Sequence, residues 1–293
     1  MARVFLTGAA GFLGRQVAAQ LRQRGHQVTS LHRRPSNDAD AVVGDLTTPS
    51  EWGARLAGHD VIVHLAAVTG KAPKLEYARV NVGGTRALIE AAHHAGVPRL
   101  LFCSSIAATF PNAGTYPYAE SKVAAEALVR QSGLRTTILR PTIIAGAGSP
   151  VLSKLAELAA LPIIPLFGDG GVRVQPILAA DLAAFIVDCI ETDRFDGEIL
   201  ELGGRDVLTI RQMLGRLHDQ QRSAAGRFLS VPMGLVLPAV GFLESLAGPR
   251  VPMTVGQLST FRFDGVARPN SLWDARRDRL ASLDTVLALT PRS

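Results

Sequence analysis

The sequence predicts an α/β protein with a Rossmann-type, doubly wound parallel sheet and a smaller C-terminal substrate domain. The first observation is the start of the chain, where a short apolar run precedes three glycines and then a helical pattern. The second is that short apolar runs alternate with helical segments through residues 1–140. Such alternation is typical of parallel strands joined by right-handed helical crossovers.

The first fourteen residues, MARVFLTGAAGFLG, predict a strand, a glycine turn and the start of a helix. Gly8, Gly11 and Gly14 have no side chains, so a phosphate can approach the backbone closely. The free N–H groups at the start of the helix, from Phe12 to Arg15, attract the same phosphate. This arrangement predicts a seat for a pyrophosphate, although the glycine spacing alone also occurs in plain turns.

The second predicted strand, residues 27–32, bears on the choice of cofactor. A carboxylate after this strand would bind the ribose hydroxyls of NAD. The sequence has Arg33 and Arg34 there, and the next acid is Asp38. Two guanidinium groups suit a 2′-phosphate, so the pattern favours NADP over NAD; the alternative is that both arginines are solvated loop residues.

The next three segments extend the predicted sheet. Residues 41–43 form a short third strand, and the carboxylate of Asp45 follows it near the expected adenine edge. Residues 60–67 are a continuous apolar run, which is typical of a strand buried on both faces. His64 within that run is interpreted as a satisfied core histidine. A long helical segment, residues 74–95, follows and is interrupted by the sequence NVGGT.

The fifth and sixth predicted strands, residues 100–105 and 135–140, enclose a loop and a helix at residues 117–129. The hydroxyls of Ser104 and Ser105 stand at the carboxyl end of the fifth strand. Ligands bind at these strand ends in open α/β sheets. The two serines are therefore placed where a substrate would lie.

The composition shifts toward Pro, Gly and Leu after Pro141, which indicates a second domain. We predict the following organisation: a dinucleotide-binding domain at 1–145 to which 178–206 return, a smaller substrate or lid domain at 146–177 and 207–286, and a tail at 287–293. The charge-free stretch 228–243 is either a helix packed into the core of the smaller domain or an apolar wall of the substrate site. Pro232 and Pro238 argue against one long helix there.

The composition also excludes several classes of protein. The net charge is +6, but the arginines are scattered between acids and alanines, so we expect no nucleic-acid surface. Cys103 and Cys189 lie in apolar contexts, which indicates buried thiols in a reducing compartment, and we expect no metal site. We expect neither a signal peptide nor an integral membrane segment, and hence a cytoplasmic protein, with peripheral membrane association left open.

Tyr118 and Lys122 carry the predicted chemistry. They are four residues apart on one predicted helix, so their side chains share a face. An ammonium beside a phenol favours the phenolate and would lower the tyrosine pKa from about 10. Ser105 can hydrogen-bond the substrate oxygen, which completes a candidate acid/base site. The alternative is an exposed Tyr–Lys helix pair with a capping serine.

The motifs TGAAGFLG, GDL, HLAA, NVGGT, YAESK and RPT together resemble the extended short-chain dehydrogenase/reductase superfamily, the NAD-dependent epimerase/dehydratases. The resemblance implies that Tyr118 is the catalytic tyrosine, that Lys122 binds the nicotinamide ribose and that Ser105 positions the substrate. The cofactor contacts that it implies in these motifs, together with the two arginines, are Thr7, Gly8, Gly11, Phe12, Leu13, Gly14, Arg33, Arg34, Asp45, Leu46, Leu65, Ala66, Ala67, Asn81, Cys103, Ser104, Tyr118, Lys122, Pro141, Thr142 and Ile143.

The sequence departs from this superfamily in two places. Ser105 and Tyr118 are only 13 residues apart, which shortens the loop between them. Arg173 is followed by Val-Gln-Pro rather than by an acid and an aromatic residue, which puts its role as a diphosphate clamp in doubt. The Gln-Pro pair and the Pro-broken apolar stretch look more like the branch that includes the accessory NAD(P)H-binding subunit of respiratory complex I.

Together these observations predict an NAD(P)-dependent oxidoreductase, with NADP favoured, that acts on the carbonyl or alcohol of a small, hydrophobic molecule. One alternative is a nucleotide-sugar epimerase or dehydratase with tightly bound NAD(P). Another is a non-catalytic sensor or assembly subunit that binds NADPH. We expect a small-molecule substrate and a homodimer; the sequence identifies neither the substrate nor the direction of the reaction.

Overall fold

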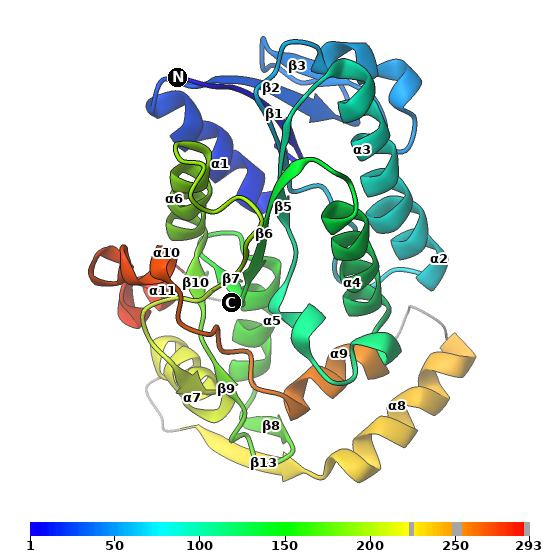
Figure 1. The fold of residues 1–293 in the computed structure, drawn as a ribbon. Helices are drawn as coiled ribbons and strands as arrows, with labels where there is room; N and C mark the ends of the chain where they lie inside the picture. Colours follow the sequence, from blue (N-terminus) through cyan, green and yellow to red (C-terminus); the bar gives the residue numbers. More distant parts are fainter. Residues whose placement is uncertain (223–225, 248–253, 290–293) are drawn as a thin grey trace. The chain divides into compact units, whose positions relative to one another are not determined.

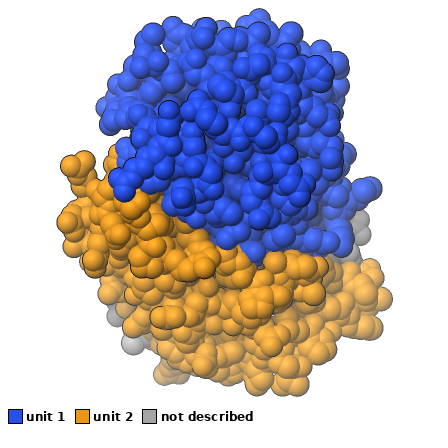
Figure 2. Space-filling view, viewed as in Figure 1, with its two compact units in different colours: residues 1–108, 117–140, 182–200 blue, residues 109–116, 141–181, 201–293 orange. Residues whose placement is uncertain are grey.

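The computed structural model describes residues 1–222, 226–247 and 254–289. Of the predicted tail 287–293, residues 290–293 lie outside the described residues. The chain forms two compact units, which Figure 2 shows in different colours. The first comprises Met1–Ala108, Pro117–Arg140 and Leu182–Leu200, and the second comprises Thr109–Tyr116, Pro141–Asp181 and Glu201–Ser293.

A seven-stranded sheet in the order β11-β6-β5-β4-β1-β2-β3 is the central element. The pairs from β3 through β6 are parallel. This order reverses direction between β1 and β4, which is the switch point of a doubly wound sheet. The predicted Rossmann-type fold is therefore confirmed. Its strands are β1 (Arg3–Thr7), β2 (Gln27–His32), β3 (Ala41–Val43), β4 (Val61–His64), β5 (Arg99–Cys103), β6 (Arg135–Pro141) and β11 (Ile199–Leu202).

Helices cover both faces of this sheet. Figure 1 shows α1 and α6 on one side and α3 and α4 on the other. A π-helical turn, Ala78–Gly83, joins α2 to α3 and contains the first three residues of the NVGGT sequence; Gly84 begins α3. The helices are α1 (Phe12–Gln23), α2 (Lys74–Tyr77), α3 (Gly84–Ala95), α4 (Pro117–Arg130) and α6 (Ala179–Ile190).

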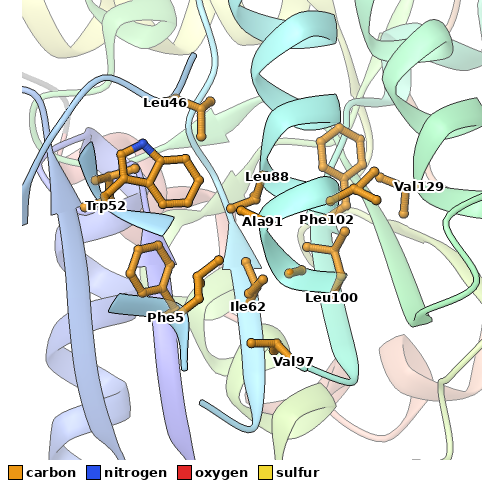
Figure 3. Close-up of a cluster of buried hydrophobic side chains, with 14 of the residues drawn as sticks. Phe5, Leu46, Trp52, Ile62, Leu88, Ala91, Val97, Leu100, Phe102 and Val129 are labelled. Carbon is orange, nitrogen blue, oxygen red and sulfur yellow. The ribbon is translucent and has the colours of Figure 1, made fainter. Parts of the chain in front are cut away.

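The core between the sheet and α3 and α4 is apolar and closely packed (Figure 3). Phe5, Ile62 and Leu100 are neighbours in register on three adjacent strands, so they share this face. The ring of Phe5 stacks on that of Trp52 at 6.0 Å. Burial of each such side chain contributes about 1.5–3 kcal/mol, so this core stabilises the packing of the sheet against α3 and α4.

The second unit has its own core, to which α5 and α7 and the short strands contribute. Its strands are β7 (Ile144–Ala145), β8 (Ile163–Phe167), β9 (Arg173–Val174), β10 (Ile177–Leu178), β12 (Leu208–Thr209) and β13 (Arg227–Val231). Its helices are α5 (Pro150–Ala159), α7 (Ile210–Gln221), α8 (Met233–Ala247), α9 (Val255–Ser259), α10 (Ser271–Asp274) and α11 (Leu283–Ala288).

The apolar stretch 228–243 is not one long helix, as its prolines predicted, because Pro232 separates β13 from α8. Helix α8 nevertheless continues through Pro238. Gly234 and Pro238 are both exposed, so water can hydrogen-bond the carbonyl that Pro238 leaves without its helical donor. Leu235 and Phe242 are exposed, so the interpretation as a core helix is wrong. Among the described residues, no helix combines the length and the hydrophobicity needed to cross a bilayer.

Candidate active site

The turn between β1 and α1 can be made only by glycine at two positions. Gly8 has a φ of +77°, and a Cβ there would lie 2.7 Å from the Ala66 nitrogen. A Cβ on Gly14 would lie 2.0 Å from the Gly8 carbonyl oxygen. The helix begins after Gly11, whose missing side chain cannot cap it. The first-turn N–H groups, including those of Phe12 and Leu13, therefore suit an anion.

A cavity of about 900 Å³ adjoins this turn and the loop after β2. Arg33 and Arg34 both line it, so the structure brings the two arginines to the same cavity as the glycine turn. The Arg15 side chain, which was not predicted to line the site, also borders this cavity; its guanidinium donates to the Ala10 carbonyl at 2.7 Å. The complete lining is Ala9, Ala10, Arg15, Ala18, Ala19, Arg22, His32, Arg33, Arg34, Pro35, Ser36 and Asp38.

Asp45 and Leu46 follow β3 and differ in their surroundings. The Asp45 carboxylate accepts hydrogen bonds from the hydroxyl and the backbone N–H of Thr47, which lower its pKa. Leu46 is buried in the core, and its side chain lies where a Cβ on Gly84 would be. Of these two residues, only Asp45 therefore has a partly exposed side chain.

His64 is a neutral residue of the core. Its Nδ1 lies 2.7 Å from the Thr7 hydroxyl and its Nε2 lies 3.0 Å from the Thr85 hydroxyl. Because Thr85 donates to the Asn81 carbonyl, its oxygen accepts from Nε2 and leaves Nδ1 as an acceptor. Burial, with the nearby charge of Lys122, lowers the pKa of His64 to about 3. Thr7 is likewise fully buried, so its side chain serves the fold.

This histidine predicts a pH dependence of stability. The unfolded chain protonates His64 below about pH 6.5, whereas the folded chain resists protonation until about pH 3. Acidification between these values therefore favours unfolding. Between pH 7 and pH 5 we expect the free energy of unfolding to fall by about 2 kcal/mol more in the wild type than in His64→Gln. Urea unfolding at both pH values measures this, with the exposed His94→Gln as control; equal losses in all three proteins would contradict it.

Asn81 holds the loop after β4 against α4. Its amide nitrogen donates to the Val68 carbonyl at 3.1 Å and to the Ser121 hydroxyl at 2.9 Å, and its oxygen accepts from the Val68 N–H at 2.7 Å. Leu65, Ala66 and Ala67 lie on this partly exposed loop. The Asn81 side chain thus positions the loop next to the glycine turn.

The side chains of Ser105 and Tyr118 are joined by a hydrogen bond. Ser105 follows β5, and Tyr118 lies in the first turn of α4, and both side chains are half-buried. Lys122, one turn further along α4, is buried and donates to the Cys103 carbonyl at 2.8 Å. Its Nζ also lies 4.9 Å from the centre of the Phe102 ring. The three residues predicted to be catalytic therefore meet at the carboxyl end of β5.

The acidities at this site differ from the expectation for Tyr118. Burial raises the pKa of Tyr118, and the hydrogen bond with Ser105 offsets only part of this effect. Burial also lowers the pKa of Lys122. The expected lowering of the phenol pKa by Lys122 is therefore wrong, because desolvation outweighs the neighbouring charge and the ammonium is bound to the Cys103 carbonyl. At neutral pH Tyr118 carries its proton.

A buried ionic network beneath this site was not predicted. Ser104 donates to Glu126 at 2.5 Å, and Arg140 donates to both oxygens of the same carboxylate at 2.9 and 2.6 Å. Glu126 is four residues after Lys122, so it continues the face of α4 that carries Tyr118 and Lys122. This spacing is the signal that could have identified it.

The remaining predicted contacts lie in different surroundings. The Cys103 thiol is buried, and burial raises its pKa. Pro141, Thr142 and Ile143 belong to the second unit, where the Thr142 hydroxyl donates to the Gln175 carbonyl. These three residues therefore belong to a different unit from the glycine turn.

Arg173, also in the second unit, is engaged by an acid. Its Nε and Nη2 donate to one Asp264 oxygen at 2.9 and 2.7 Å, and its backbone N–H donates to the other at 2.8 Å. The side chain is more than half exposed, so the ion pair is screened by water. A diphosphate would have to compete with Asp264 for this guanidinium.

Comparison with known proteins adds an independent finding. A protein-family model described as the NAD dependent epimerase/dehydratase family matches residues 4–203. Among similar proteins, a ceramide reductase of Caulobacter vibrioides is 38% identical over 193 residues, which cover 63% of this chain and 59% of the relative. A 3-beta-hydroxysteroid dehydrogenase of Mycolicibacterium neoaurum is 32% identical over 185 residues, which cover 53% of this chain and 50% of the relative. The aligned regions thus span only half to three fifths of these two relatives.

One relative is aligned over most of this chain. It is subunit 9 of the alpha subcomplex of mitochondrial NADH dehydrogenase [ubiquinone] from Arabidopsis thaliana, 27% identical over 282 residues, which cover 88% of this chain and 67% of the subunit. Among solved structures, the Thermus thermophilus UDP-glucose 4-epimerase in complex with NAD has a TM-score of 0.70 at 20% identity, with 98% and 97% of the two chains covered. This structural likeness supports the fold alone.

Proposed function

The chain belongs to the NAD-dependent epimerase/dehydratase family, and from this premise we propose that it is an NAD(P)-dependent reductase or dehydrogenase of a small, hydrophobic molecule. The observation that carries the proposal is the hydrogen-bonded pair of Ser105 and Tyr118 at the carboxyl end of β5, with Lys122 one turn along α4. A pair of hydroxyls held in this way can bind one carbonyl oxygen. The reaction proposed is the interconversion of a ketone and an alcohol.

The chemistry assigned to the residues follows from their protonation. NAD(P)H, when bound, supplies the hydride that reduces the carbonyl carbon. Tyr118 carries a proton at neutral pH, so it donates this proton to the carbonyl oxygen while Ser105 holds that oxygen. The buried Lys122 places a positive charge near the phenolate that remains. The protonated phenol is the form that reduction requires, and the reverse oxidation would require the phenolate.

The first unit fits a dinucleotide. Gly8 and Gly14 leave no room for a Cβ, and the start of α1 has no side-chain cap, so a pyrophosphate could approach the backbone there. The cavity of about 900 Å³ beside this turn suits the adenosine half. We propose that Arg33 and Arg34 bind a 2′-phosphate, because both line this cavity and both are exposed. NADP is therefore the proposed cofactor.

Removal of these two arginines tests the cofactor preference. We expect Arg33→Ala/Arg34→Ala to weaken NADPH binding about tenfold or more, because each charge-assisted contact to phosphate contributes about 1.5–3 kcal/mol. NADH binding should change little, since NADH has no 2′-phosphate. Calorimetric titration with both cofactors measures this.

The matched control is Arg55→Ala/Arg86→Ala, which removes the same charge from two exposed arginines that do not line the cavity. It should leave both affinities within about twofold, because exposed charges are screened. A wild-type protein that binds NADH and NADPH equally would refute the preference for NADP.

Two relatives and one ion pair support a hydrophobic substrate. The relatives are a ceramide reductase and a 3-beta-hydroxysteroid dehydrogenase, and the compounds in their names are hydrophobic. Arg173 is bound to Asp264, which disfavours the alternative of a nucleotide-sugar epimerase or dehydratase. The test is the oxidation of NADPH with a panel of apolar ketones and, in parallel, binding of nucleoside diphosphate sugars. Tight sugar-nucleotide binding without response to any ketone would refute the proposal.

A second candidate function comes from the alignment with the NADH dehydrogenase subunit, which covers 88% of this chain. Under this candidate the protein binds NADPH as a sensor or assembly subunit and reduces nothing. The two candidates differ in one measurement: the reductase oxidises NADPH with an apolar ketone, whereas the subunit binds NADPH and leaves every carbonyl unchanged.

A further inference from the structure

The second unit carries an apolar surface that its own core does not use. Half of the large hydrophobic side chains that are exposed among the described residues lie on β8, β13, α8 and the residues next to them. We call these residues the α8 surface: Leu161, Ile163, Leu229, Leu235, Phe242, Leu243 and Leu246. Contiguous apolar patches of this kind are uncommon on soluble monomers and mark sites of interaction.

The outward side of α8 is apolar along its whole length. Leu235, Phe242 and Leu246 are 69%, 65% and 71% exposed, and their spacing of seven and four residues aligns them on one side of the helix. The exposed Pro238 and Ala239 lie on the same side. The helix also contains Glu244, whose carboxylate accepts the Val255 N–H at 2.9 Å and so holds the start of α9.

The strand pair β8–β13 also has an exposed apolar face. In the parallel register Arg227 is opposite Ile163, and Leu229 is opposite Pro165. Cross-strand partners share a face, so Ile163 and Leu229 are exposed together on one side of the pair. Figure 1 shows β13 beside β8, with α8 following β13 and extending away from the strand pair.

Arginines border the α8 surface. Arg227 lies on its β13 edge. Arg211 is not part of this border, because it packs on Phe228, whose side chain points to the opposite face of β13 from Leu229. Arg262 is exposed in the turn after α9, where the adjacent ring of Phe261 packs 5.7 Å from that of Phe167 on β8. Asp169 follows β8, and one of its oxygens accepts the Gly171 N–H. The border is therefore predominantly positive.

We propose that the α8 surface docks the protein on a bilayer that contains anionic lipids. The apolar side of α8 lies at the boundary between headgroups and acyl chains, and Arg227 and Arg262 meet the lipid phosphates. An apolar face with a basic border is typical of a segment that lies in the membrane interface. Each arginine near an anionic surface adds about fivefold to binding.

The outward side of α8 carries few side-chain hydrogen-bonding groups, which favours lipid over a protein partner. Specific protein interfaces carry about one hydrogen bond per 100–200 Å². On the outward side of α8 the hydroxyl of Ser245 already donates to the Phe242 carbonyl at 2.7 Å. A fluid hydrocarbon phase needs no such bonds, whereas a second copy of this chain or another protein would need them to set its position.

Vesicle sedimentation of the full chain tests the proposal, with phosphatidylcholine vesicles and with vesicles that also contain phosphatidylglycerol. The wild type is expected to bind both and to prefer the anionic vesicles. Leu235→Ser/Phe242→Ser should bind both about tenfold or more weakly, because two large side chains no longer enter the interface. Arg227→Gln/Arg262→Gln should lose the preference for the anionic vesicles and bind both kinds about as the wild type binds phosphatidylcholine alone.

The control is Leu75→Ser, which removes an equally exposed leucine, 79% exposed, from α2 in the first unit. It should bind like the wild type. Unchanged unfolding temperatures of the variants show that the fold is intact, as expected for exposed sites. The proposal is overturned if the wild type binds neither vesicle, if Leu75→Ser is equally impaired, or if Leu235→Ser/Phe242→Ser instead converts a sedimenting dimer to a monomer, which would assign the surface to a second copy.

Discussion

Tyr118→Phe is expected to lower kcat by about 10²–10⁴-fold on any ketone that the wild type reduces. Phenylalanine keeps the ring between its neighbours but has no proton to donate, and Ser105 loses its hydrogen-bond partner. Cofactor affinity should change little, because the glycine turn and the arginine-lined cavity are untouched. Steady-state kinetics together with calorimetric titration of NADPH measures both quantities.

Tyr77→Phe is the matched control for this prediction. The Tyr77 ring lies 6.3 Å from that of Tyr118, in an edge-to-face arrangement, and its hydroxyl donates to the Gly70 carbonyl. Tyr77→Phe therefore removes a phenolic hydroxyl close to the site but leaves the Ser105–Tyr118 pair intact. Its kcat should stay within about threefold of the wild-type value. Lys122→Met should impair both turnover and cofactor affinity. Near-wild-type turnover by Tyr118→Phe would remove Tyr118 from the mechanism.

Glu126→Ala is expected to lower the free energy of unfolding by about 3–5 kcal/mol, as does removal of one partner from other buried ion pairs. Glu126 accepts both Arg140 donors and the Ser104 hydroxyl, and its side chain is only 4% exposed. Its loss therefore removes three hydrogen bonds in a region with little water. Urea unfolding of the two proteins at neutral pH measures the difference.

Glu120→Ala is the control on the same helix, because Glu120 pairs with Lys74 where both side chains are exposed. Exposed pairs contribute about 0–1 kcal/mol, so this variant should be nearly as stable as the wild type. In Glu126→Leu/Arg140→Met both charges are absent, so it should be more stable than Glu126→Ala. A cost below that of Glu120→Ala would show that the buried network does not stabilise the first unit.

The fold could be predicted because its signals are local. The apolar run that contains Phe5 is too short for a helix and forms β1, and Gly8 takes the positive φ that the sharp turn requires. The face shared by Tyr118 and Lys122 follows from the helical period, and both lie on α4. Each of these inferences depends on residues close together in the chain, and the period of 2.0 or 3.6 residues is a property of the backbone.

Local patterns did not predict the chemistry of side chains whose surroundings come from distant parts of the chain. The spacing of Tyr118 and Lys122 suggested a lowered phenol pKa, but burial raises it and the β5 carbonyl of Cys103 binds the ammonium. Likewise, Glu126 acquires its role only because β6 brings Arg140 to α4.

The sequence by itself thus determined the Rossmann-type sheet, the glycine turn and the residues that share a helix face, because the backbone period and the side-chain volume act locally. The tertiary structure decided which of these side chains are desolvated, which charges have partners and which apolar side chains are left uncovered. Leu235 shows the difference: its hydrophobicity predicts that it favours burial, yet only the packing of the second unit shows that nothing in the described chain covers α8 on that side. Hydrophobicity measures the tendency to leave water, and the fold determines whether the chain itself supplies the cover.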